Sequence, residues 1–253
     1  MHPTTPTESA GSARRSRTLI ALAAAGATAA GLAVMVAGSP AGAVPAQGTG
    51  CAAVTVITAR ASTEAAGEGI TGALAQAIQN DSQQTVRRAS VNYPATLNNY
   101  ANSSLQGINA LKSQLTNLVN SCPNTKVVLL GYSQGAHVVG DVLGGGQGGS
   151  LGTATAPVAA NVASHVVAVA TFGDPRHVTN GPNFNAGTAR TNGLFPRNQT
   201  QINNLNAFSP RIRAWCDAND EFCASGASLN VHLTYLNRYQ NTAEQFVLGR
   251  IGG

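Results

Sequence analysis

The segment from Lys126 to Val139, KVVLLGYSQGAHVV, constrains the fold and chemistry of this chain most strongly. Its apolar, β-branched start is typical of a buried strand, and it continues through Gly131-Tyr-Ser-Gln-Gly135 into residues with helical spacing. This is the G-x-S-x-G pattern of a nucleophile elbow, which holds a serine at the tip of a sharp strand-to-helix turn. Side chains two positions before and after the serine would collide with neighbouring backbone, which explains both glycines. Ser133 is therefore a candidate nucleophile, unless the segment is only a glycine-rich turn with an ordinary serine.

The first 43 residues have the three parts of an export signal. Arg14-Arg-Ser-Arg17 supplies positive charge, residues 18–38 form an Ala-rich apolar run, and Ala41-Gly-Ala43 matches a small-x-small cleavage site. The apolar run is long enough to be a membrane anchor, but its composition and the cleavage site favour removal. The paired arginines are also compatible with twin-arginine export.

The rest of the chain fits one domain, residues 51–253, after a short flexible lead at 44–50. With 43% apolar and 10% charged residues, the composition suits a compact secreted protein. The net charge of +5 includes three arginines of the leader, and the other basic residues are scattered, so we expect no nucleic-acid partner. No later stretch is apolar enough to insert stably into a membrane. We expect a monomer without cofactor or metal.

Four cysteines fit an oxidising compartment and allow three disulfide connectivities. Cys216 and Cys223 are close enough to close a small loop, which leaves Cys51 to pair with Cys122. Closing a loop of about 70 residues contributes roughly 4 kcal/mol on the chain-entropy model. A zinc site is the competing interpretation, but no C-x-x-C or nearby histidine pair supports it.

Apolar patterns predict an alternation of strands and helices. Strands are expected at 53–59, 85–93, 126–132, 166–172 and 211–216; helices follow the turn at 60–64 up to about residue 80, span 103–120, follow Ser133, and run to about residue 250. This order is that of a doubly wound parallel sheet in the α/β class. A long polar loop at 179–210 is expected to be functional or disordered, for example as the wall of a cleft.

A nucleophilic serine needs a histidine base, and the base needs an acid. On this architecture the chain order is serine, acid, histidine. His137, one turn into the helix after the serine, is predicted to pack against the sheet, and His165 to be structural. His177 lies three residues after an aspartate, too close for its ring to sit between acid and serine. His232 follows several acids and has apolar neighbours that suit a cleft, so it is the predicted base.

The acid has several candidates. The predicted Cys216–Cys223 loop holds Asp217, Asp220 and Glu221, and the cross-link would hold a carboxylate rigidly. Asp174 is predicted to be a loop contact and Asp141 a solvated helix residue. Ser62, in the turn after the first strand, is either a helix cap or part of an oxyanion hole facing the elbow.

Together these residues resemble the cutinase family and its acetylxylan esterase relatives, over essentially all of residues 51–250. The resemblance is carried by the elbow GYSQGA, the segment Cys216-Asp-Ala-Asn-Asp-Glu-Phe-Cys223, the late His232, Thr58-Ala-Arg-Ala-Ser-Thr-Glu64, Val91-Asn-Tyr-Pro-Ala95 and Ser121-Cys-Pro-Asn-Thr125. The chain departs from the family at Ala61, where cutinases often have glycine.

The resemblance implies a lidless α/β-hydrolase, with helices on both sides of a five-stranded parallel sheet. It implies an ester hydrolase with Ser133 as nucleophile, His232 as base and Asp220 as the acid. It also places the oxyanion hole at the backbone N–H groups of Ser62 and Gln134, with help from the Ser62 hydroxyl.

Two substrate classes remain. Leu229, Val231 and Leu233 beside the predicted base form an apolar rim, which favours aliphatic acyl chains in a cutin-like polyester or lipid. Gly173-Asp-Pro175 and the segment 211–223 instead resemble the acetylxylan esterase branch, which would prefer acetyl groups on a glycan. A third possibility from another class is a secreted, non-catalytic polymer-binding protein on a hydrolase fold.

Overall fold

The computed structural model describes residues 50–252, so the predicted leader at 1–43 and most of the lead lie outside the described residues. Within them, six strands form one sheet in the order β2-β1-β3-β4-β6-β5, and every neighbouring pair is parallel. The strands are β1 (Val54–Ala59), β2 (Val86–Ser90), β3 (Lys126–Tyr132), β4 (Val166–Phe172), β5 (Asn185–Ala186) and β6 (Ile212–Trp215).

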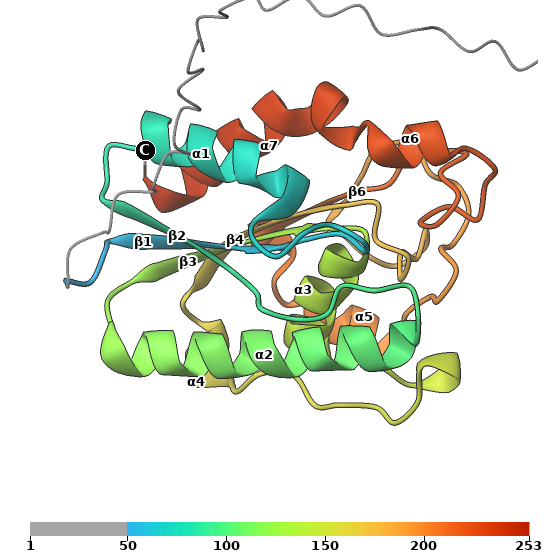
Figure 1. The fold of residues 1–253 in the computed structure, drawn as a ribbon, viewed down its shortest axis with the longest axis horizontal. Coiled ribbons are helices and arrows are strands. Elements are labelled where there is room, and N and C mark those ends of the chain that lie inside the picture. The colour runs from blue at the N-terminus through green and yellow to red at the C-terminus, as the bar shows by residue number, and fades with distance from the viewer. Residues whose placement is uncertain (1–49, 253) are drawn as a thin grey trace, which may run out of the picture. The chain divides into compact units, whose positions relative to one another are not determined.

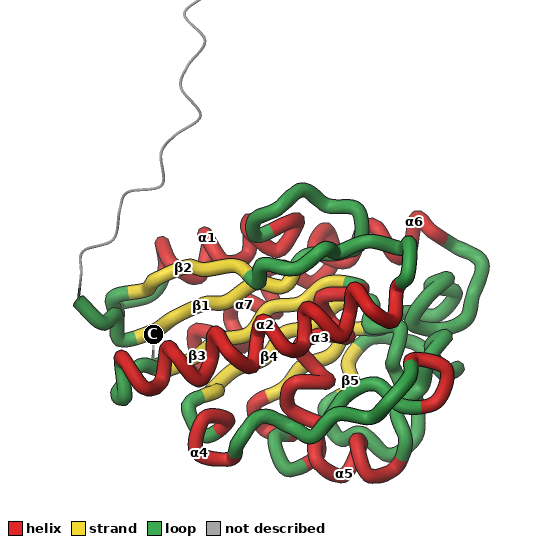
Figure 2. The backbone as a smooth tube through the Cα atoms, turned by 60° about the horizontal axis from the view of Figure 1, so that its bottom comes forward, coloured by secondary structure: helices red, strands yellow, loops and turns green. Residues whose placement is uncertain are grey.

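Helices cover both faces of this sheet, which gives three layers (Figures 1 and 2). One face carries α1 (Gly72–Asp81) and α7 (Tyr235–Ile251), which pack against each other, and the other carries α2 (Tyr100–Ser121) and α3 (Gln134–Gly144). Three shorter helices are α4 (Ala160–Ala163), α5 (Gln199–Asn206) and α6 (Leu229–Leu233). The predicted doubly wound α/β class is confirmed.

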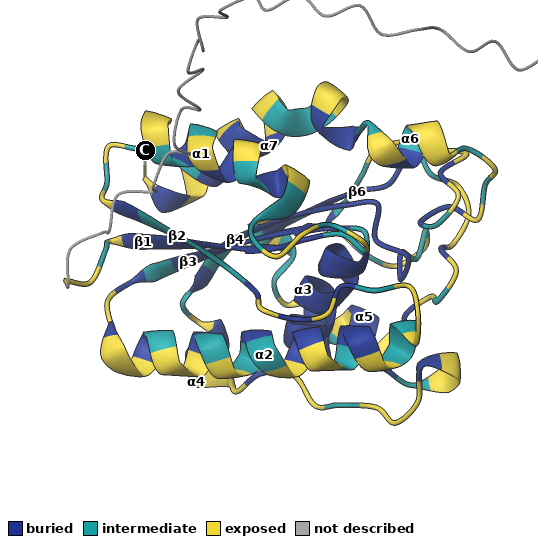
Figure 3. Cartoon of the chain, viewed as in Figure 1, coloured by how far each residue is buried: buried dark blue, intermediate teal, exposed yellow. Residues whose placement is uncertain are grey.

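The sheet divides the hydrophobic core into two clusters. Figure 3 shows that most of the sheet between the helical layers is buried. Alternate side chains of β3 enter opposite clusters: Leu129 packs with α2 and α3, whereas Val128 and Leu130 pack with α1 and α7. Successive side chains of a strand point to opposite faces, so a strand covered on both sides must be apolar throughout. This is why the run before the elbow shows no alternation.

The sheet has six strands instead of the expected five. The additional strand, β5, is only two residues long and lies in the segment 179–210, which was expected to be a loop. The same segment contains α5, which begins with a capping box: Asn198 accepts the N–H of Gln201, and the Gln201 side chain accepts the N–H of Asn198. Because this segment is polar and has no periodic apolar pattern, its sequence indicated neither β5 nor α5.

The candidate site lies where the chain crossovers change direction. From β1 the chain continues to β2 at one edge, and from β3 it continues to β4 on the other side. The carboxyl ends of β1 and β3 are neighbours, with Ala59 paired to Gly131. Ligands of open α/β sheets bind at such a switch point, outside the carboxyl ends of the strands. Ser62 and Ser133 both follow these two ends.

Both predicted disulfides are confirmed. Cys51 is bonded to Cys122, which joins the start of β1 to the end of α2, and Cys216 is bonded to Cys223 directly after β6. Among the described helices, none combines the length and apolar character needed to cross a membrane.

Candidate active site

Ser133 has the strained backbone expected of a nucleophile elbow. Its φ of 53° and ψ of −118° lie outside the usual regions for a residue with a side chain. The turn is also crowded. A Cβ on Gly131 would lie 2.7 Å from the carbonyl oxygen of Gly135, and one on Gly135 would lie 1.9 Å from that of Ala59. Both glycines are thus required sterically, as predicted.

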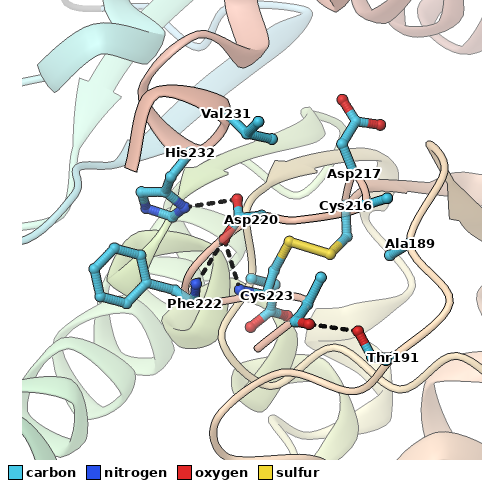
Figure 4. The surroundings of a disulfide bond; sticks show 12 residues. Ala189, Thr191, Cys216, Asp217, Asp220, Phe222, Cys223, Val231 and His232 are labelled. Atoms are coloured by element: carbon cyan, nitrogen blue, oxygen red, sulfur yellow. Dashed lines mark hydrogen bonds and ion pairs between the residues drawn. A yellow bond between two sulfur atoms is a disulfide. The ribbon is translucent and has the colours of Figure 1, made fainter. Parts of the chain in front are cut away.

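The predicted base and acid form a hydrogen-bonded pair (Figure 4). Nδ1 of His232 lies 2.8 Å from Oδ2 of Asp220. The other carboxylate oxygen, Oδ1, accepts the backbone N–H groups of Phe222 at 2.7 Å and Cys223 at 2.8 Å. The Cys216–Cys223 disulfide holds this turn, so Asp220 is fixed by its own loop rather than only by its partner.

The surroundings of Asp220 favour its ionised form. Burial opposes ionisation, but the hydrogen bond and charge of His232, together with the N–H groups of Cys223 and Phe222, hold the pKa of Asp220 below its usual value. Tyr235 donates its hydroxyl to Oδ2 at 2.9 Å, and burial and the charge of Asp220 raise the pKa of Tyr235 well above its usual value. The tyrosine therefore remains a donor to the carboxylate.

His232 is positioned by its backbone as well as its ring. It lies in α6, which is capped by Ser228, and Tyr132 donates its hydroxyl to the His232 carbonyl. Burial raises the pKa of Tyr132 to about 12, so this donor also stays protonated. Gly173, after β4, makes room for the imidazole, since a Cβ there would lie 2.7 Å from Cε1. His232 lines the same cleft as Ser133.

The turn after β1 supplies a buried hydroxyl without a partner. Among the described residues, Ser62 Oγ makes no hydrogen bond, although it is buried at the wall of the cleft. The cap alternative fails because α1 begins only at Gly72. Arg60 and Glu64 hold the turn: Arg60 donates to the carbonyl of Tyr93 at 2.5 Å, and Glu64 accepts the N–H of Ala61 at 2.6 Å.

Gln134 lies opposite this turn at the first position of α3. Its side chain is buried and donates to the carbonyl of Thr96 at 3.2 Å while accepting the Ser103 hydroxyl at 3.3 Å. Its backbone N–H is among the first of the helix, which have no intrahelical acceptor. An oxyanion hole formed by the N–H groups of Ser62 and Gln134 stays a prediction.

The cleft shared by Ser133 and His232 has a volume of about 310 Å³ and is lined mainly by apolar side chains. Its rim is exposed: Leu229 and Leu233 are 49% and 56% accessible to solvent. Val231 was expected to belong to this rim, but it is half-buried and is not one of the described residues lining the cleft. In α6 positions 229 and 233 share a face, whereas position 231 points the opposite way.

Several lining residues were not predicted. Leu97, Leu194 and Phe195 form further parts of the cleft wall, and Phe222 packs edge-on against His232 with ring centroids 4.5 Å apart. Leu97 and Leu194 are 58% and 47% exposed. The sequence offered one signal for Leu97 and Leu194: each is a large apolar residue within a polar loop. Such a loop has no apolar neighbours to bury the side chain, which suggests a binding surface.

The other candidate acids and histidines do not line the cleft of Ser133. Asp217 accepts from Arg238 Nε at 3.0 Å and from the Tyr239 hydroxyl at 2.8 Å, and Glu221 is exposed. His165 Nδ1 bonds the carbonyl of Thr125 at 3.1 Å. His177 is buried, and burial lowers its pKa. Asp174 is a loop contact, as predicted; it pairs with Arg197 at 2.6 Å.

Asp141 is not the solvated residue that was predicted. It is completely buried and binds Arg176 at 2.6 Å, Arg197 at 3.0 Å and His137 Nε2 at 3.0 Å. All residues of α3 are buried, so this helix has no polar face on which a carboxylate could reach water. Arg176 and Arg197 lie at the two ends of the segment that carries Leu194 and Phe195 to the cleft, so the cluster joins α3 to the cleft wall.

Comparisons with known proteins identify the family. The family described as Cutinase matches residues 50–251 of the chain. The chain belongs to the cutinase family. Acetylxylan esterase of Hypocrea jecorina is 35% identical over 206 residues, which are 78% of this chain and 67% of the relative. Cutinase 11 of Verticillium dahliae is 33% identical over 79% of this chain and 70% of its own length.

A solved structure extends the likeness to the fold. The catalytic core domain of acetyl xylan esterase from Trichoderma reesei aligns with a TM-score of 0.72 at 33% identity, covering 79% of this chain and 100% of that one. Cutinase and acetylxylan esterase are both carboxylic ester hydrolases, and this chain is a carboxylic ester hydrolase with the cutinase-like α/β-hydrolase fold.

Proposed function

We propose that this cutinase-family protein is a secreted serine esterase that forms an acyl-enzyme on Ser133. The observation that supports this most strongly is the position of His232, which is hydrogen-bonded to Asp220 and lines the same cleft as the strained Ser133. A serine and an imidazole in one cleft, with an acid hydrogen-bonded to the imidazole, are the parts needed for nucleophilic catalysis without a metal or cofactor.

Each group has one role. The Ser133 hydroxyl attacks the ester carbonyl while His232 Nε2 takes its proton, and Asp220 holds the imidazole through Nδ1 and stabilises its positive charge. The N–H groups of Ser62 and Gln134 bind the developing oxyanion, and the unpartnered Ser62 hydroxyl gives it a third donor. His232 then protonates the leaving alcohol, and water activated by the same imidazole releases the acid.

The apolar cleft favours esters of aliphatic acids. Four of the five large apolar side chains that are exposed on the described surface, those of Leu97, Leu194, Leu229 and Leu233, line this cleft. Such a cluster stabilises an alkyl chain by removing its surface from water, at about 25 cal/mol per Å². We therefore infer that the substrates are cutin-like polyester, lipid or short- to medium-chain acyl esters.

The relatives favour a second candidate. Proteins named acetylxylan esterase match this chain both by sequence and as solved structures. An enzyme of that kind would remove acetyl groups from a polysaccharide, and it would need a polar surface for the sugar near the cleft.

Export and oligomeric state belong to the same proposal. Residues 1–43 would act as a signal peptide removed after export, leaving a short lead at 44–50 and the enzyme domain from Cys51 onward. Two disulfides support an oxidising destination such as the extracellular space. We propose that the mature enzyme is a monomer that acts on its ester substrate without inserting into a membrane.

The test is hydrolysis of p-nitrophenyl esters from acetyl to long-chain acyl, by the mature protein and by Ser133→Ala. Rates that peak at medium chain length and vanish in the variant would support the hypothesis that the substrates are esters of aliphatic acids. A steep preference for acetate would favour the glycan esterase. Activity that does not depend on Ser133 would overturn the proposed nucleophile. No activity, together with inertness to a fluorophosphonate, would overturn the esterase proposal and favour a non-catalytic binding protein.

A further inference from the structure

The loop between β2 and α2, residues 91–99, contacts both sides of the proposed oxyanion hole. Ser62 lies in the turn after β1 and Gln134 begins α3, so the two N–H groups of the hole come from different turns of the chain. Their spacing depends on what joins these turns. Carbonyl groups of the β2–α2 loop bind the Ser62 turn on one side and the Gln134 side chain on the other.

On the Ser62 side, the loop binds residues before and after that serine. Thr63, the next residue along the chain, donates its backbone N–H to the carbonyl of Ala95 at 2.6 Å. Arg60 donates to the carbonyl of Tyr93 at 2.5 Å, and the Tyr93 hydroxyl donates back to the Arg60 carbonyl at 2.5 Å. The Ser62 turn is therefore attached to the loop at both of its ends.

Both residues of the Thr63–Ala95 hydrogen bond have a backbone conformation that side chains disfavour. Thr63 has a φ of 69° and Ala95 has a φ of 51°, both in the left-handed region. Such residues persist only where the surrounding structure determines their conformation, and they cluster at active sites. The strain indicates that this contact fixes the Ser62 turn in one place.

On the Gln134 side, Ser103 of α2 completes a ring of hydrogen bonds. The Ser103 hydroxyl accepts the backbone N–H of Thr96 at 3.1 Å and donates to Oε1 of Gln134 at 3.3 Å. Nε2 of Gln134 donates to the carbonyl of Thr96 at 3.2 Å, which closes the ring. Ser103 is 1% and Gln134 is 0% exposed, so water does not compete for these groups. Because both ends of the Gln134 amide are held, its backbone N–H beside Ser133 is held with them.

From these contacts we propose that Ser103 is a positioning residue for ester hydrolysis. Through the ring with Thr96 and Gln134, it fixes the Gln134 N–H at the spacing from Ser62 that the oxyanion requires. This inference rests on the proposed serine esterase function and adds a residue that acts through Gln134, since Ser103 is not among the described residues lining the cleft. Donors that are fixed in advance stabilise developing charge without reorganisation, and a small displacement of a donor lowers the rate.

The first test compares Ser103→Ala with Ser104→Ala. Ser104 is a matched control, because it is the next residue of α2 and is 0% exposed, but its hydroxyl donates to the carbonyl of Tyr100 at 3.0 Å and accepts the Gln147 amide at 3.1 Å. Ser103→Ala should lower kcat for p-nitrophenyl butyrate by about 10–100-fold with little change in KM, whereas Ser104→Ala should keep kcat close to the wild-type value. Circular dichroism identifies the temperature range in which both variants are folded. Equal kcat values in the two variants would overturn the proposal.

A double-mutant cycle determines whether Ser103 acts through Gln134. Gln134→Met keeps the length of the side chain and the backbone N–H but removes both polar atoms of the ring. It should lower kcat about as much as Ser103→Ala does. Addition of Ser103→Ala to Gln134→Met should then cause no further loss, because the ring is already broken. Losses that add in the double variant would overturn the positioning role.

A transition-state analogue separates positioning from a general effect on stability. An alkyl trifluoromethyl ketone adds to the nucleophilic serine and places an oxyanion in the hole. Its inhibition constant should rise in Ser103→Ala by the factor by which kcat/KM falls, and it should not rise in Ser104→Ala. An unchanged constant in Ser103→Ala would overturn the proposal, while wild-type hydrolysis that depends on Ser133 would leave the proposed function standing. Wild-type protein without such hydrolysis would overturn the proposed function and this inference with it.

Discussion

The molecule contains two buried Asp–His pairs with nearly the same hydrogen bond and opposite surroundings. Asp220 and His232 are joined at 2.8 Å, and Asp141 and His137 at 3.0 Å. In the first pair the second ring nitrogen has no partner among the described residues, and the ring lines the cleft of Ser133. In the second pair the other ring nitrogen is bonded to the Tyr100 hydroxyl at 3.0 Å.

The carboxylates differ in the same way. Asp220 is held by neutral donors, namely two backbone N–H groups and Tyr235, so its negative charge is available to an imidazolium. Asp141 is bound by two arginines, which already neutralise it. An Asp–His hydrogen bond is thus not enough to make a base. The charge of the acid must not already be neutralised by neighbouring cations, and the second ring nitrogen of the histidine must face a nucleophile.

The difference between the two Asp–His pairs is tested most directly by replacing the two histidines in turn. His232→Gln should lower kcat/KM by on the order of 10⁶, because the serine then has no proton acceptor. His137→Gln should leave the Asp220–His232 pair intact and change kcat far less. The measurement is p-nitrophenyl butyrate hydrolysis at a temperature where circular dichroism shows both variants folded. Comparable losses in the two variants would mean that His137 takes part in the chemistry.

Replacement of Asp220, the proposed acid, should give the next largest effect. Asp220→Asn should keep the loop geometry but favour the wrong imidazole tautomer, which lowers kcat by about 10⁴. The Cys216–Cys223 disulfide should preserve stability, so a change in kcat would not come from unfolding. If Asp220→Asn retained most of its kcat while Asp217→Asn did not, the other aspartate of the loop would be the acid.

Ser62 extends the comparison to buried groups with and without a hydrogen-bond partner. Every carboxylate oxygen of Asp141 has a partner, whereas the Ser62 hydroxyl has none among the described residues. If the transition state supplies that partner, Ser62→Ala should lower kcat by about 10²–10³ with little change in KM. A rise in KM at constant kcat would instead assign Ser62 to ground-state binding.

The parts of this site that could be predicted are those set by local chemistry. The elbow, its two glycines and the order of serine, acid and histidine follow from steric and topological rules that act over a few residues or one crossover. The choice of Asp220 over Asp217 did not follow from spacing and needed the family pattern. The structure shows the physical reason: Asp217 is occupied by Arg238 and Tyr239, about 20 residues further along the chain.

What could not be predicted depends on distant partners or on segments without periodicity. Asp141 was expected in solvent because one aspartate in an apolar helix does not reveal arginines 35 and 56 residues away. The wall at Leu194 and Phe195 lies in a segment with no repeat pattern. The two-residue strand β5 is too short for any pattern to indicate it.

The structural role of the second pair predicts a loss of stability. Asp141→Asn would leave Arg176 buried without its counter-charge, and removal of one partner of a buried ion pair costs about 3–5 kcal/mol. Asp217→Asn is the matched control, because its partner Arg238 is 34% exposed and can be hydrated. Urea unfolding should therefore show a much larger loss for Asp141→Asn. Equal losses would mean that burial of the arginine does not decide the cost.

The smallest expected effect is the acid sensitivity that Asp141 confers. Burial opposes its ionisation, but the charges of His137 and Arg197 outweigh this and hold its pKa at about 2, below the usual 3.8. As the pH falls below about 4, the unfolded chain takes up this proton first, so the folded state loses stability until the pH approaches 2. This group contributes about 2 kcal/mol to the free energy of unfolding. The contribution is fully present above about pH 4 and is lost as the pH falls towards 2. Unfolding free energies measured between pH 5 and 2.5 should fall more steeply for the wild type than for Asp141→Asn, whose amide does not titrate. Parallel curves would show that the acid lability arises elsewhere, with Asp220, whose pKa is also lowered, as the next group to replace.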